Sequence, residues 1–254
     1  MPPLEPAEAL AALDLGGRKV LVVAFAYNEG PKILATLARF PRPAPFLYAV
    51  ADDGSTDGSV EAYRRFPDVR VIRHERNRGI GAAMKTVNRI ALEEGVDVIV
   101  HMAGNNKDDP TELPRLLGPI LRGEADYVQG SRYVTGGGWG NMPRYRVLAT
   151  RLVHPLLFSL LARRRVTDST NGFRAFRTAL LRDPNIRWDE AWLDHYELEP
   201  YVFMQAIRLG YRVVEVPVTK IYPPHQLGYT KMKPIVGWWS ILRPLVYVGL
   251  GLRR

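Results

Sequence analysis

Short apolar runs that alternate with amphipathic segments constrain the fold of this chain more than any other feature. The apolar runs cover residues 20–26, 46–51, 69–73 and 97–102, and the segments with helical periodicity cover residues 30–39, 58–65, 79–94 and 111–122. Such alternation forms βαβ units, so the pattern predicts an α/β fold with a mainly parallel central sheet flanked by helices. Pro31 suits the first turn of a helix, and Gly95 and Gly123 stand where helices end. A further strand is predicted at residues 127–130.

Polar residues follow three of the predicted strands at their carboxyl ends. They occupy residues 27–29, residues 52–58 (Asp-Asp-Gly-Ser-Thr-Asp-Gly) and residues 101–110 (His-Met-Ala-Gly-Asn-Asn-Lys-Asp-Asp-Pro). In open α/β sheets, ligands bind in the crevice beyond these strand ends. Carboxylate and amide oxygens there can accept hydrogen bonds from ribose hydroxyls and from the donor edge of a base. The second motif is equally typical of a solvated turn that caps the next helix, and both interpretations stay open.

The composition and net charge of the chain indicate which kinds of molecule it binds. The chain has 254 residues, 46% of them hydrophobic, which suits one α/β domain with a short appendage. Its formal charge of +9 indicates an anionic partner. The basic residues are scattered and no nucleic-acid-binding motif is present, so a phospholipid surface or a phosphorylated substrate is favoured over nucleic acid. Cysteine is absent, which excludes disulfides and thiol chemistry. Residues 1–6 do not resemble a secretory signal, so we expect a cytoplasmic protein.

Two apolar segments outside the alternating pattern allow several interpretations. Residues 146–161 are apolar around most of a helix and end in Arg163-Arg164-Arg165. They are shorter than the roughly 20 residues that span a bilayer, and predict a core helix, a dimer face or a face turned to lipid. Residues 234–252 contain Trp238-Trp239 and Arg243-Pro244. They suit an amphipathic helix on a membrane surface, or a tail that packs over the domain or against a second subunit.

Six motifs occur in a fixed order along the chain. They are residues 22–29, 51–58, 77–83, 130–132, 168–174 and 215–217. Together they resemble the motifs of family 2 glycosyltransferases, in particular the dolichol-phosphate mannosyltransferase and polyprenyl-phosphate glycosyltransferase group. The resemblance implies a GT-A fold, a nucleotide-diphosphate sugar as donor, and inversion at the anomeric carbon. It also divides the chain into an N-terminal extension (1–17), a GT-A catalytic domain (18–222) and a C-terminal loop with an interfacial helical tail (223–254).

The loop after the fourth strand departs from the family pattern. When the shared Asp109-Pro110 is aligned, the metal-binding Asp-x-Asp of the family falls on Ala103 and Asn105, and a position often filled by Gln falls on Lys107. Two carboxylates are thus replaced by neutral residues and one cation is added. The local charge moves by about three units in the direction that a lost dication requires.

Two hypotheses follow from this departure. The first is that Lys107, helped by Arg132 and Lys231, takes over the role of the metal, because a lysine ammonium acts as a point charge on phosphate oxygens. The second keeps a weakly held Mg²⁺ or Mn²⁺ on oxygens of the same loop, since hard cations accept amide and carboxylate oxygens alike. The candidate ligands of such a metal are Asn105, Asp108 and Asp109.

The resemblance also assigns residues to the donor site. It implies that the base, ribose and sugar are surrounded by Ala26, Tyr27, Glu29, Asp52, Asp53, Asn77, Gly79 and Asn105. Phe25 stands where the family usually has proline, so the identity of the base is not predicted. Gly79 either allows the backbone to approach the nucleotide closely or opens the following helix.

On the acceptor side, the resemblance points to several cations and one carboxylate. Arg132, Arg146, Arg174 and Lys231 are expected to face phosphate or the acceptor, since arginine presents paired donors that suit phosphate. Asp168 either holds one of these arginines in place or forms a structural salt bridge. Glu199 matches a carboxylate of the family, with Asp194 and Glu197 nearby in sequence, and one of these three is expected to touch sugar hydroxyls or act as a base. The predicted catalytic set is Lys107, Arg132, Asp109 and Glu199.

The chemistry of the acceptor decides whether a base is needed. An alcohol must lose a proton near the transition state, whereas a phosphate monoester ionises near pH 6 and arrives anionic. The cations on the acceptor side therefore favour a polyprenyl phosphate at the inner face of the membrane. A hydroxyl acceptor and a nucleotide-sugar-binding protein without turnover remain alternatives, and a second subunit remains a candidate partner. A dehydrogenase is disfavoured because no Gly-x-Gly-x-x-Gly follows the first strand.

Overall fold

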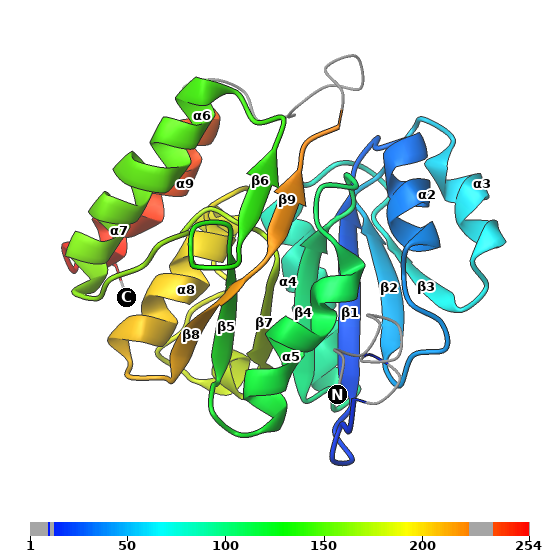
Figure 1. Cartoon of the computed structure of the whole chain (residues 1–254), viewed down its shortest axis with the longest axis horizontal. Coiled ribbons are helices and arrows are strands. Elements are labelled where there is room, and N and C mark those ends of the chain that lie inside the picture. Colours follow the sequence, from blue (N-terminus) through cyan, green and yellow to red (C-terminus); the bar gives the residue numbers. More distant parts are fainter. Residues whose placement is uncertain (1–9, 11–12, 224–235, 254) are drawn as a thin grey trace.

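A seven-stranded sheet forms the centre of the computed structural model, which describes residue 10, residues 13–223 and residues 236–253 (Figure 1). The strand order is β3-β2-β1-β4-β7-β5-β8. The strands are β1 (Val20–Ala26), β2 (Leu47–Asp52), β3 (Val69–Arg73), β4 (Val98–Ala103), β5 (Tyr127–Ser131), β7 (Arg174–Arg177) and β8 (Val213–Pro217). Neighbouring strands are parallel except at β7, which is antiparallel to both β4 and β5. The predicted α/β fold with a mainly parallel sheet is confirmed; the antiparallel strand was not predicted.

The continuous apolar run of β1 is explained by burial on both faces of the sheet. All seven of its residues are buried, as expected for a central parallel strand covered by helices. Side chains of a strand alternate between faces, so Leu21, Val23 and Phe25 join one core and Val20 and Val22 join the other. The first core contains residues of α4 (Ile80–Glu93) and α8 (Leu198–Arg208), and the second contains residues of α2 (Pro31–Ala38) and α5 (Leu113–Leu121).

The predicted helices of the first half are present with shifted ends. The segment predicted at residues 58–65 is α3 (Ser59–Ala62) followed by a 3-10 turn at Tyr63–Arg65. The segment predicted at residues 111–122 begins as a 3-10 turn at Pro110–Glu112 and continues as α5.

A second, two-stranded sheet pairs β6 (Gly138–Gly140) with β9 (Thr219–Ile221) in parallel. β9 follows β8 after a single residue and runs alongside the loop that follows β4. An isolated bridge joins Asp108 to Lys220, and the Ile221 amide donates to the carbonyl of Lys107 at 2.9 Å. Strand pairing thus brings a segment more than a hundred residues away to the centre of the predicted site.

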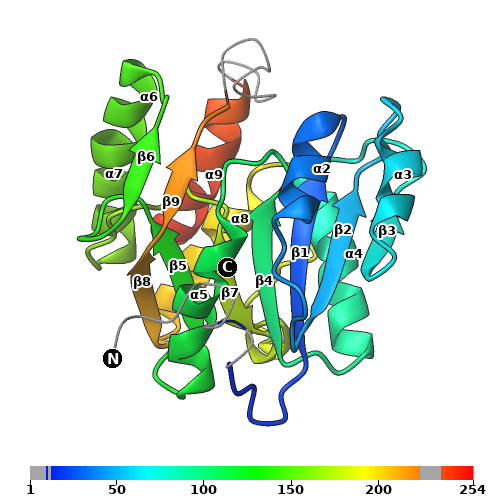
Figure 2. The same ribbon diagram turned by 45° about the vertical axis from the view of Figure 1, so that its right-hand side comes forward.

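The segment predicted at residues 146–161 lies in one rod formed by α6 (Arg144–Leu148), a π-helical turn (Ala149–Val153) and α7 (His154–Ala162). Figures 1 and 2 show this rod along one edge of the molecule, beside β6. One side of α7 is core, where His154 and Phe158 are buried, so the core interpretation holds for that side only.

The C-terminal helix α9 (Val236–Gly249) packs against α7 and α8. Leu245 and Val248 are buried in the same core, and Gly249 lies against Leu161. The interpretation as a tail that packs over the domain therefore fits this helix. The predicted domain boundaries stay a prediction, and residues 224–235 lie outside the described part of the chain.

Candidate active site

The carboxyl ends of β1, β2 and β4 meet at one edge of the sheet. Ala26 pairs with Asp52 in the register of β1 and β2, and Phe25 pairs with Ala103 in the register of β1 and β4. The loops after these three strands are therefore neighbours (Figure 2). This is the crevice at which a ligand is expected in such a sheet.

Asp52 and Asp53 are both buried, and their carboxylates accept hydrogen bonds from backbone amides of the neighbouring loops. Asp52 accepts from the amide of Ser55 and from the hydroxyl of Tyr63, both at 2.7 Å. The carboxylate of Asp53 holds the loop that precedes α4 in place by hydrogen bonds. It accepts from the amides of Arg78 (3.0 Å) and Gly79 (2.8 Å) and from the side chain of Asn77 (2.9 Å), and it lies 2.7 Å from Nδ1 of His74.

Gly79 is required by packing. Its φ is +103°, and a Cβ there would lie 2.3 Å from the carbonyl oxygen of Asp194. It also immediately precedes α4, so the helix-opening interpretation fits.

The first loop is tied to the second. The amide of Asn28 donates to Oγ of Ser55 at 2.8 Å, and Oδ1 of Asn28 accepts from the amide of Thr56 at 2.7 Å. Glu29 pairs with Lys32 at 2.7 Å, and the ring of Tyr27 is 36% exposed. Among the candidates of the first loop, Ala26, Tyr27 and Glu29, Tyr27 is therefore the one exposed to a base or ribose.

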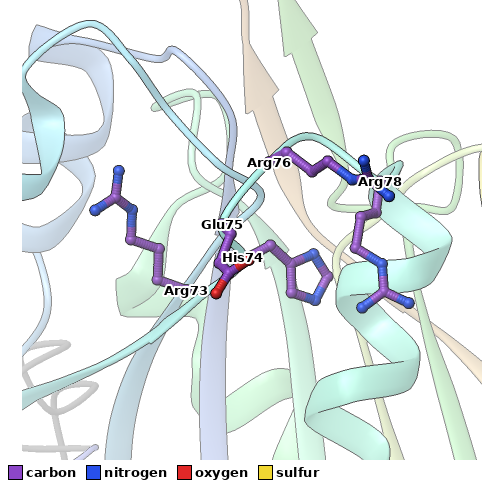
Figure 3. Close-up of a pocket in the computed structure, with 5 residues that line it drawn as sticks. All are labelled: Arg73, His74, Glu75, Arg76 and Arg78. Carbon is purple, nitrogen blue, oxygen red and sulfur yellow. The ribbon is translucent and has the colours of Figure 1, made fainter.

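A hollow of about 640 Å³ adjoins these loops (Figure 3). It is lined by Arg73, His74, Glu75, Arg76 and Arg78. Figure 3 shows Arg73 directed away from Arg76 and Arg78, so the three cations do not converge on one anion. Since His74 and Arg78 also contact Asp53, the hollow lies next to the base end of the expected donor site.

The loop after β4 is held close to β1. Gly104 donates its amide to the carbonyl of Phe25 at 2.8 Å, and a Cβ on Gly104 would lie 2.7 Å from that same oxygen. Asn105 contributes Oδ1, which is buried and has no hydrogen-bond partner among the described residues. The amide of Asn106 donates to Oγ1 of Thr36 in α2 at 3.0 Å. This backbone is therefore fixed before any ligand binds.

Both carboxylates of this loop are already engaged. Asp108 is buried; it accepts from the amide of Ala103 at 2.9 Å and forms a short ion pair with Lys220. Asp109 accepts from the amide and hydroxyl of Thr111 and pairs with Arg39 at 2.9 Å, which makes it the cap of the next helical turn.

A divalent metal does not fit these residues. A divalent metal such as Mg²⁺ is usually held by one or two carboxylates together with substrate phosphates and water. Here the Asp-x-Asp positions hold Ala103 and Asn105, and the carboxylates of Asp108 and Asp109 are neutralised by a lysine and an arginine. In the described ranges there is also no group of three or more His, Cys, Asp or Glu side chains able to hold a metal.

Lys107 lies in a buried, cation-rich position. Its Nζ is 4.4 Å from the ring centre of Tyr222, and the guanidinium of Arg146 lies 5.8 Å from the same ring. Burial, together with the charges of Lys220 and Arg146, lowers the pKa of Lys107 to about 7 against the opposing effect of Glu29 and Asp108. A group in this position gains most from an incoming anion, because charge interactions are strong where water is excluded.

The predicted pairing of Asp168 with an arginine is present. Nε and Nη2 of Arg132 donate to the two carboxylate oxygens of Asp168 at 2.6 and 2.8 Å, and both residues are buried. Burial alone would raise the pKa of Asp168, but Arg132 holds it below its usual value. Arg132 also donates to Oγ1 of Thr170 at 2.8 Å. Most of its donors are thus committed within the protein.

Arg174 and Glu199 lie deeper in the protein than the sequence indicated. Arg174 pairs with Glu199 at 3.1 Å and donates to the hydroxyl of Tyr127 at 3.1 Å and, at short range, to the carbonyl of Asn171. Both residues border a cavity of about 10 Å³, roughly the size of one water molecule. The structure therefore places Arg174 among core side chains rather than beside Lys107 and Arg146.

Sequence reasoning missed three residues of this site: Asn171, Lys220 and Tyr222. Asn171 stood inside the motif at residues 168–174 without an assigned role, and it accepts from Lys220 at 3.1 Å. Lys220 and Tyr222 lie just past the motif at residues 215–217, where only the pairing of β9 reveals their neighbours. Lys231, predicted to bind phosphate, lies outside the described residues.

Comparison with known proteins places the chain in a family. The model of glycosyl transferase family 2 matches residues 21–185. The chain is 33% identical to an undecaprenyl-phosphate mannosyltransferase of Micrococcus luteus over 222 residues, which cover 84% of this chain and 87% of that protein. It is 32% identical to a polyprenol monophosphomannose synthase of Mycolicibacterium smegmatis over 226 residues, covering 85% of this chain and 81% of the relative.

Solved structures agree on the fold. The glucosyl-3-phosphoglycerate synthase of Mycobacterium tuberculosis, in complex with Mn²⁺, UDP and glucosyl-3-phosphoglycerate, superposes with a TM-score of 0.68 at 20% identity. The match covers 99% of this chain and 85% of that structure. At this level of identity the likeness identifies the GT-A fold.

Proposed function

This chain belongs to glycosyl transferase family 2, and from that membership we propose that it transfers a sugar from a nucleoside diphosphate sugar to a polyprenyl phosphate. The observation that carries the proposal is the position of Lys107 and Arg146, which both lie over the ring of Tyr222. Arg146 belongs to the first turn of α6, whose outer side is apolar and exposed. A lipid phosphate suits this arrangement, because Arg146 offers a cation to its head group, the outer side of α6 offers an apolar surface to its tail, and Lys107 is left to face the donor diphosphate.

The reaction is an in-line substitution with inversion at the anomeric carbon. An oxygen of the acceptor phosphate forms the new bond to that carbon while the bond to the diphosphate oxygen breaks. The electron pair of the broken bond leaves with the nucleoside diphosphate, and no proton has to be removed from the acceptor. The protein therefore has to orient two anionic groups and stabilise the charge that develops on the diphosphate.

In this proposal the donor lies along the loops that follow β1, β2, β3 and β4. Tyr27 offers its exposed ring to the base or ribose, and Asp53 fixes the loop at Asn77 and Gly79. Oδ1 of Asn105 is placed to accept from a hydroxyl of the donor, since a buried acceptor without a partner gains from such a bond. Ala26, Glu29 and Asp52 complete the proposed donor site.

The carboxylates near the acceptor side argue against an alcohol acceptor. Asp194 pairs with Lys85 at 2.6 Å, Glu197 with Arg243 at 2.6 Å, and Glu199 with Arg174 at 3.1 Å. A general base for an alcohol must lie within hydrogen-bond reach of the hydroxyl that it deprotonates, and these three carboxylates are already held in ion pairs with cations of the protein. We therefore propose that Glu199 orients Arg174 and does not remove a proton.

The outer side of α6 and α7 supports contact with a membrane surface. Its exposed side chains are Tyr145, Leu148, Leu152, Val153, Leu156 and Leu160, each between 56 and 73% exposed. Exposed arginines stand along and after the same rod, at Arg151 and at Arg163-Arg164-Arg165. Leucines flanked by arginines suit an anionic lipid surface, which attracts the cations while the apolar side chains enter the interface. We propose that the chain acts as a peripheral protein at the cytoplasmic face. Within the described ranges, every helix is too short or too polar to cross a bilayer.

The proposal is tested in two steps. Thermal shift with UDP, GDP and dTDP sugars should identify a donor, because a ligand that binds the native state raises its melting temperature. The donor is then incubated with a polyprenyl phosphate, and the lipid fraction is examined for the sugar. Transfer into that fraction supports the proposal. Donor binding without transfer to any acceptor would instead support a nucleotide-sugar-binding protein.

A further inference from the structure

We propose that Lys107, positioned with the help of Lys220, takes the place of a divalent metal, so that sugar transfer by this chain needs no metal ion. The inference rests on the proposed function, because the group to be neutralised is the diphosphate that leaves the sugar. It concerns the loop at residues 103–109 and the strand β9 beside it.

The charge balance of this loop favours an anion over a cation. Its two carboxylates, Asp108 and Asp109, are ion-paired with Lys220 and Arg39, from β9 and from the end of α2. Lys107 adds a positive charge immediately before them in sequence. A diphosphate that approaches the loop therefore meets a cation and carboxylates that are already neutralised. A divalent cation would meet a lysine and two carboxylates that are already ion-paired.

The surroundings of Lys107 strengthen its effect on an anion. Its side chain is buried, its Nζ faces the ring of Tyr222 at 4.4 Å, and its carbonyl accepts from the amide of Ile221 at 2.9 Å. A unit charge in a site that excludes water acts on a nearby phosphate several times more strongly than in bulk water. Because the backbone is held on β9, the side chain is in position before the donor binds, as electrostatic stabilisation of a leaving group requires.

Lys220 is a positioning residue in this account. Its Nζ pairs with Asp108 and donates to Asn171 at 3.1 Å, so its charge is used inside the protein. Without it, the carboxylate of Asp108 would carry an unbalanced negative charge next to Lys107 and would compete with the diphosphate for that lysine. Lys220 thus balances the charge of Asp108 beside Lys107.

The first test measures nucleotide binding by calorimetry, which does not depend on activity. UDP, GDP and dTDP are titrated into metal-stripped protein in EDTA, and again with Mn²⁺. We expect affinities in the two conditions to agree within about twofold. Lys107→Met should weaken diphosphate binding about tenfold, the loss expected for one charge-assisted contact, and leave uridine or guanosine binding unchanged. Lys19→Met, at the opposite end of β1, is the matched control and should change neither.

The outcomes separate this inference from the proposed function. Nucleotide binding or transfer that appears only with Mn²⁺ or Mg²⁺ would overturn the role of Lys107. Equal loss of nucleoside and diphosphate binding in Lys107→Met would do the same, since it would show a structural effect. If UDP, GDP and dTDP all fail to bind under either condition, the proposed function itself is wrong.

A second variant tests the same idea in reverse. Ala103→Asp, Asn105→Asp and Lys107→Gln together rebuild the family pattern at this loop. We expect this triple variant to bind UDP or GDP weakly in EDTA and at least tenfold more tightly with Mn²⁺. Binding in EDTA as tight as that of the unmodified protein would overturn the proposal. If the triple variant does not fold, Lys107→Met and the EDTA titration still decide the question.

Discussion

Lys220 and Asp108 form an ion pair inside the site, between β9 and the loop that ends β4. Lys220 also reaches Asn171, whose carbonyl oxygen accepts from Arg174, and Arg174 pairs with Glu199. One chain of polar contacts therefore connects the loop of Lys107 with a carboxylate on α8. Because these groups are largely buried, removal of one of them leaves its neighbour in the chain as a buried polar or charged group without its hydrogen-bond or ion-pair partner.

Removal of Lys220 should destabilise the protein strongly. Lys220→Met leaves the Asp108 carboxylate buried and unpaired, which costs about 3–5 kcal/mol in the free energy of unfolding. Lys220→Met combined with Asp108→Asn removes the charge as well, and should recover more than half of that loss. Urea unfolding of both variants measures the effect. A single variant within 1 kcal/mol of the unmodified protein would show that the pair contributes little.

The pH dependence of kcat/KM for the donor should reflect the protonation of Lys107. Four charged groups act on it: Lys220 on β9, Arg146 on α6, Glu29 after β1 and Asp108 in its own loop. Burial and the two cations lower its pKa to about 7, so in the free enzyme the charged form is lost as the pH rises through that value. We expect kcat/KM for the donor to fall above about pH 7, because this parameter reports groups of the free enzyme.

Lys107→Arg provides the control for this profile. Arginine stays charged at every pH used, so the fall above pH 7 should disappear even if the maximal rate decreases. An unchanged alkaline limb in the arginine variant would assign the titration to another group.

Much of the fold follows from local pattern, whereas the contacts of the site depend on strand pairing. The run at Val20–Ala26 and the proline at Pro31 predicted β1 and α2 because burial on both faces and the first turn of a helix leave clear signals. The antiparallel β7 gave no such signal, since its four residues contain two arginines. Its place between β4 and β5 is decided by tertiary contacts.

The same dependence on strand pairing explains which residues of the site the sequence identified and which it missed. Asp53 and Lys107 were identified because they stand in motifs at the ends of strands. Lys220 and Tyr222 were missed because their partners, Asp108 and Lys107, lie more than a hundred residues away and meet them through β9. Arg174 was expected to face the acceptor, but the sequence does not show how deeply a side chain is buried.

Loss of Asp53 should loosen the loop that precedes α4. Its carboxylate accepts from the amides of Arg78 and Gly79, and unmet buried donors cost about 1–3 kcal/mol each. Asp53→Ala should weaken nucleotide binding about tenfold or more and speed hydrogen exchange at those two amides. Asp189→Ala removes an exposed ion pair with Arg89 and serves as the control. Unchanged exchange at Arg78 and Gly79 would contradict the role given to Asp53.

The apolar side of α7 should control binding to lipid. Leu156→Glu with Leu160→Glu places two charges where apolar side chains are 65 and 73% exposed. Sedimentation with vesicles of anionic phospholipid should fall at least tenfold, since apolar contact is lost and like charge is added. Leu209→Glu introduces one such charge at an exposed leucine away from this face, and should retain vesicle binding. If the double variant still sediments and only its oligomeric state changes, this face is a subunit contact.

The proposed acceptor chemistry is tested most directly by competition between a polyprenyl phosphate and the matching polyprenol, with the donor sugar labelled. Mass spectrometry of the lipid products identifies the acceptor, and NMR of the product gives the anomeric configuration. The account predicts a sugar phosphate linkage with inverted configuration and no detectable product from the alcohol. Transfer to the alcohol, or a product that keeps the configuration of the donor, would contradict it.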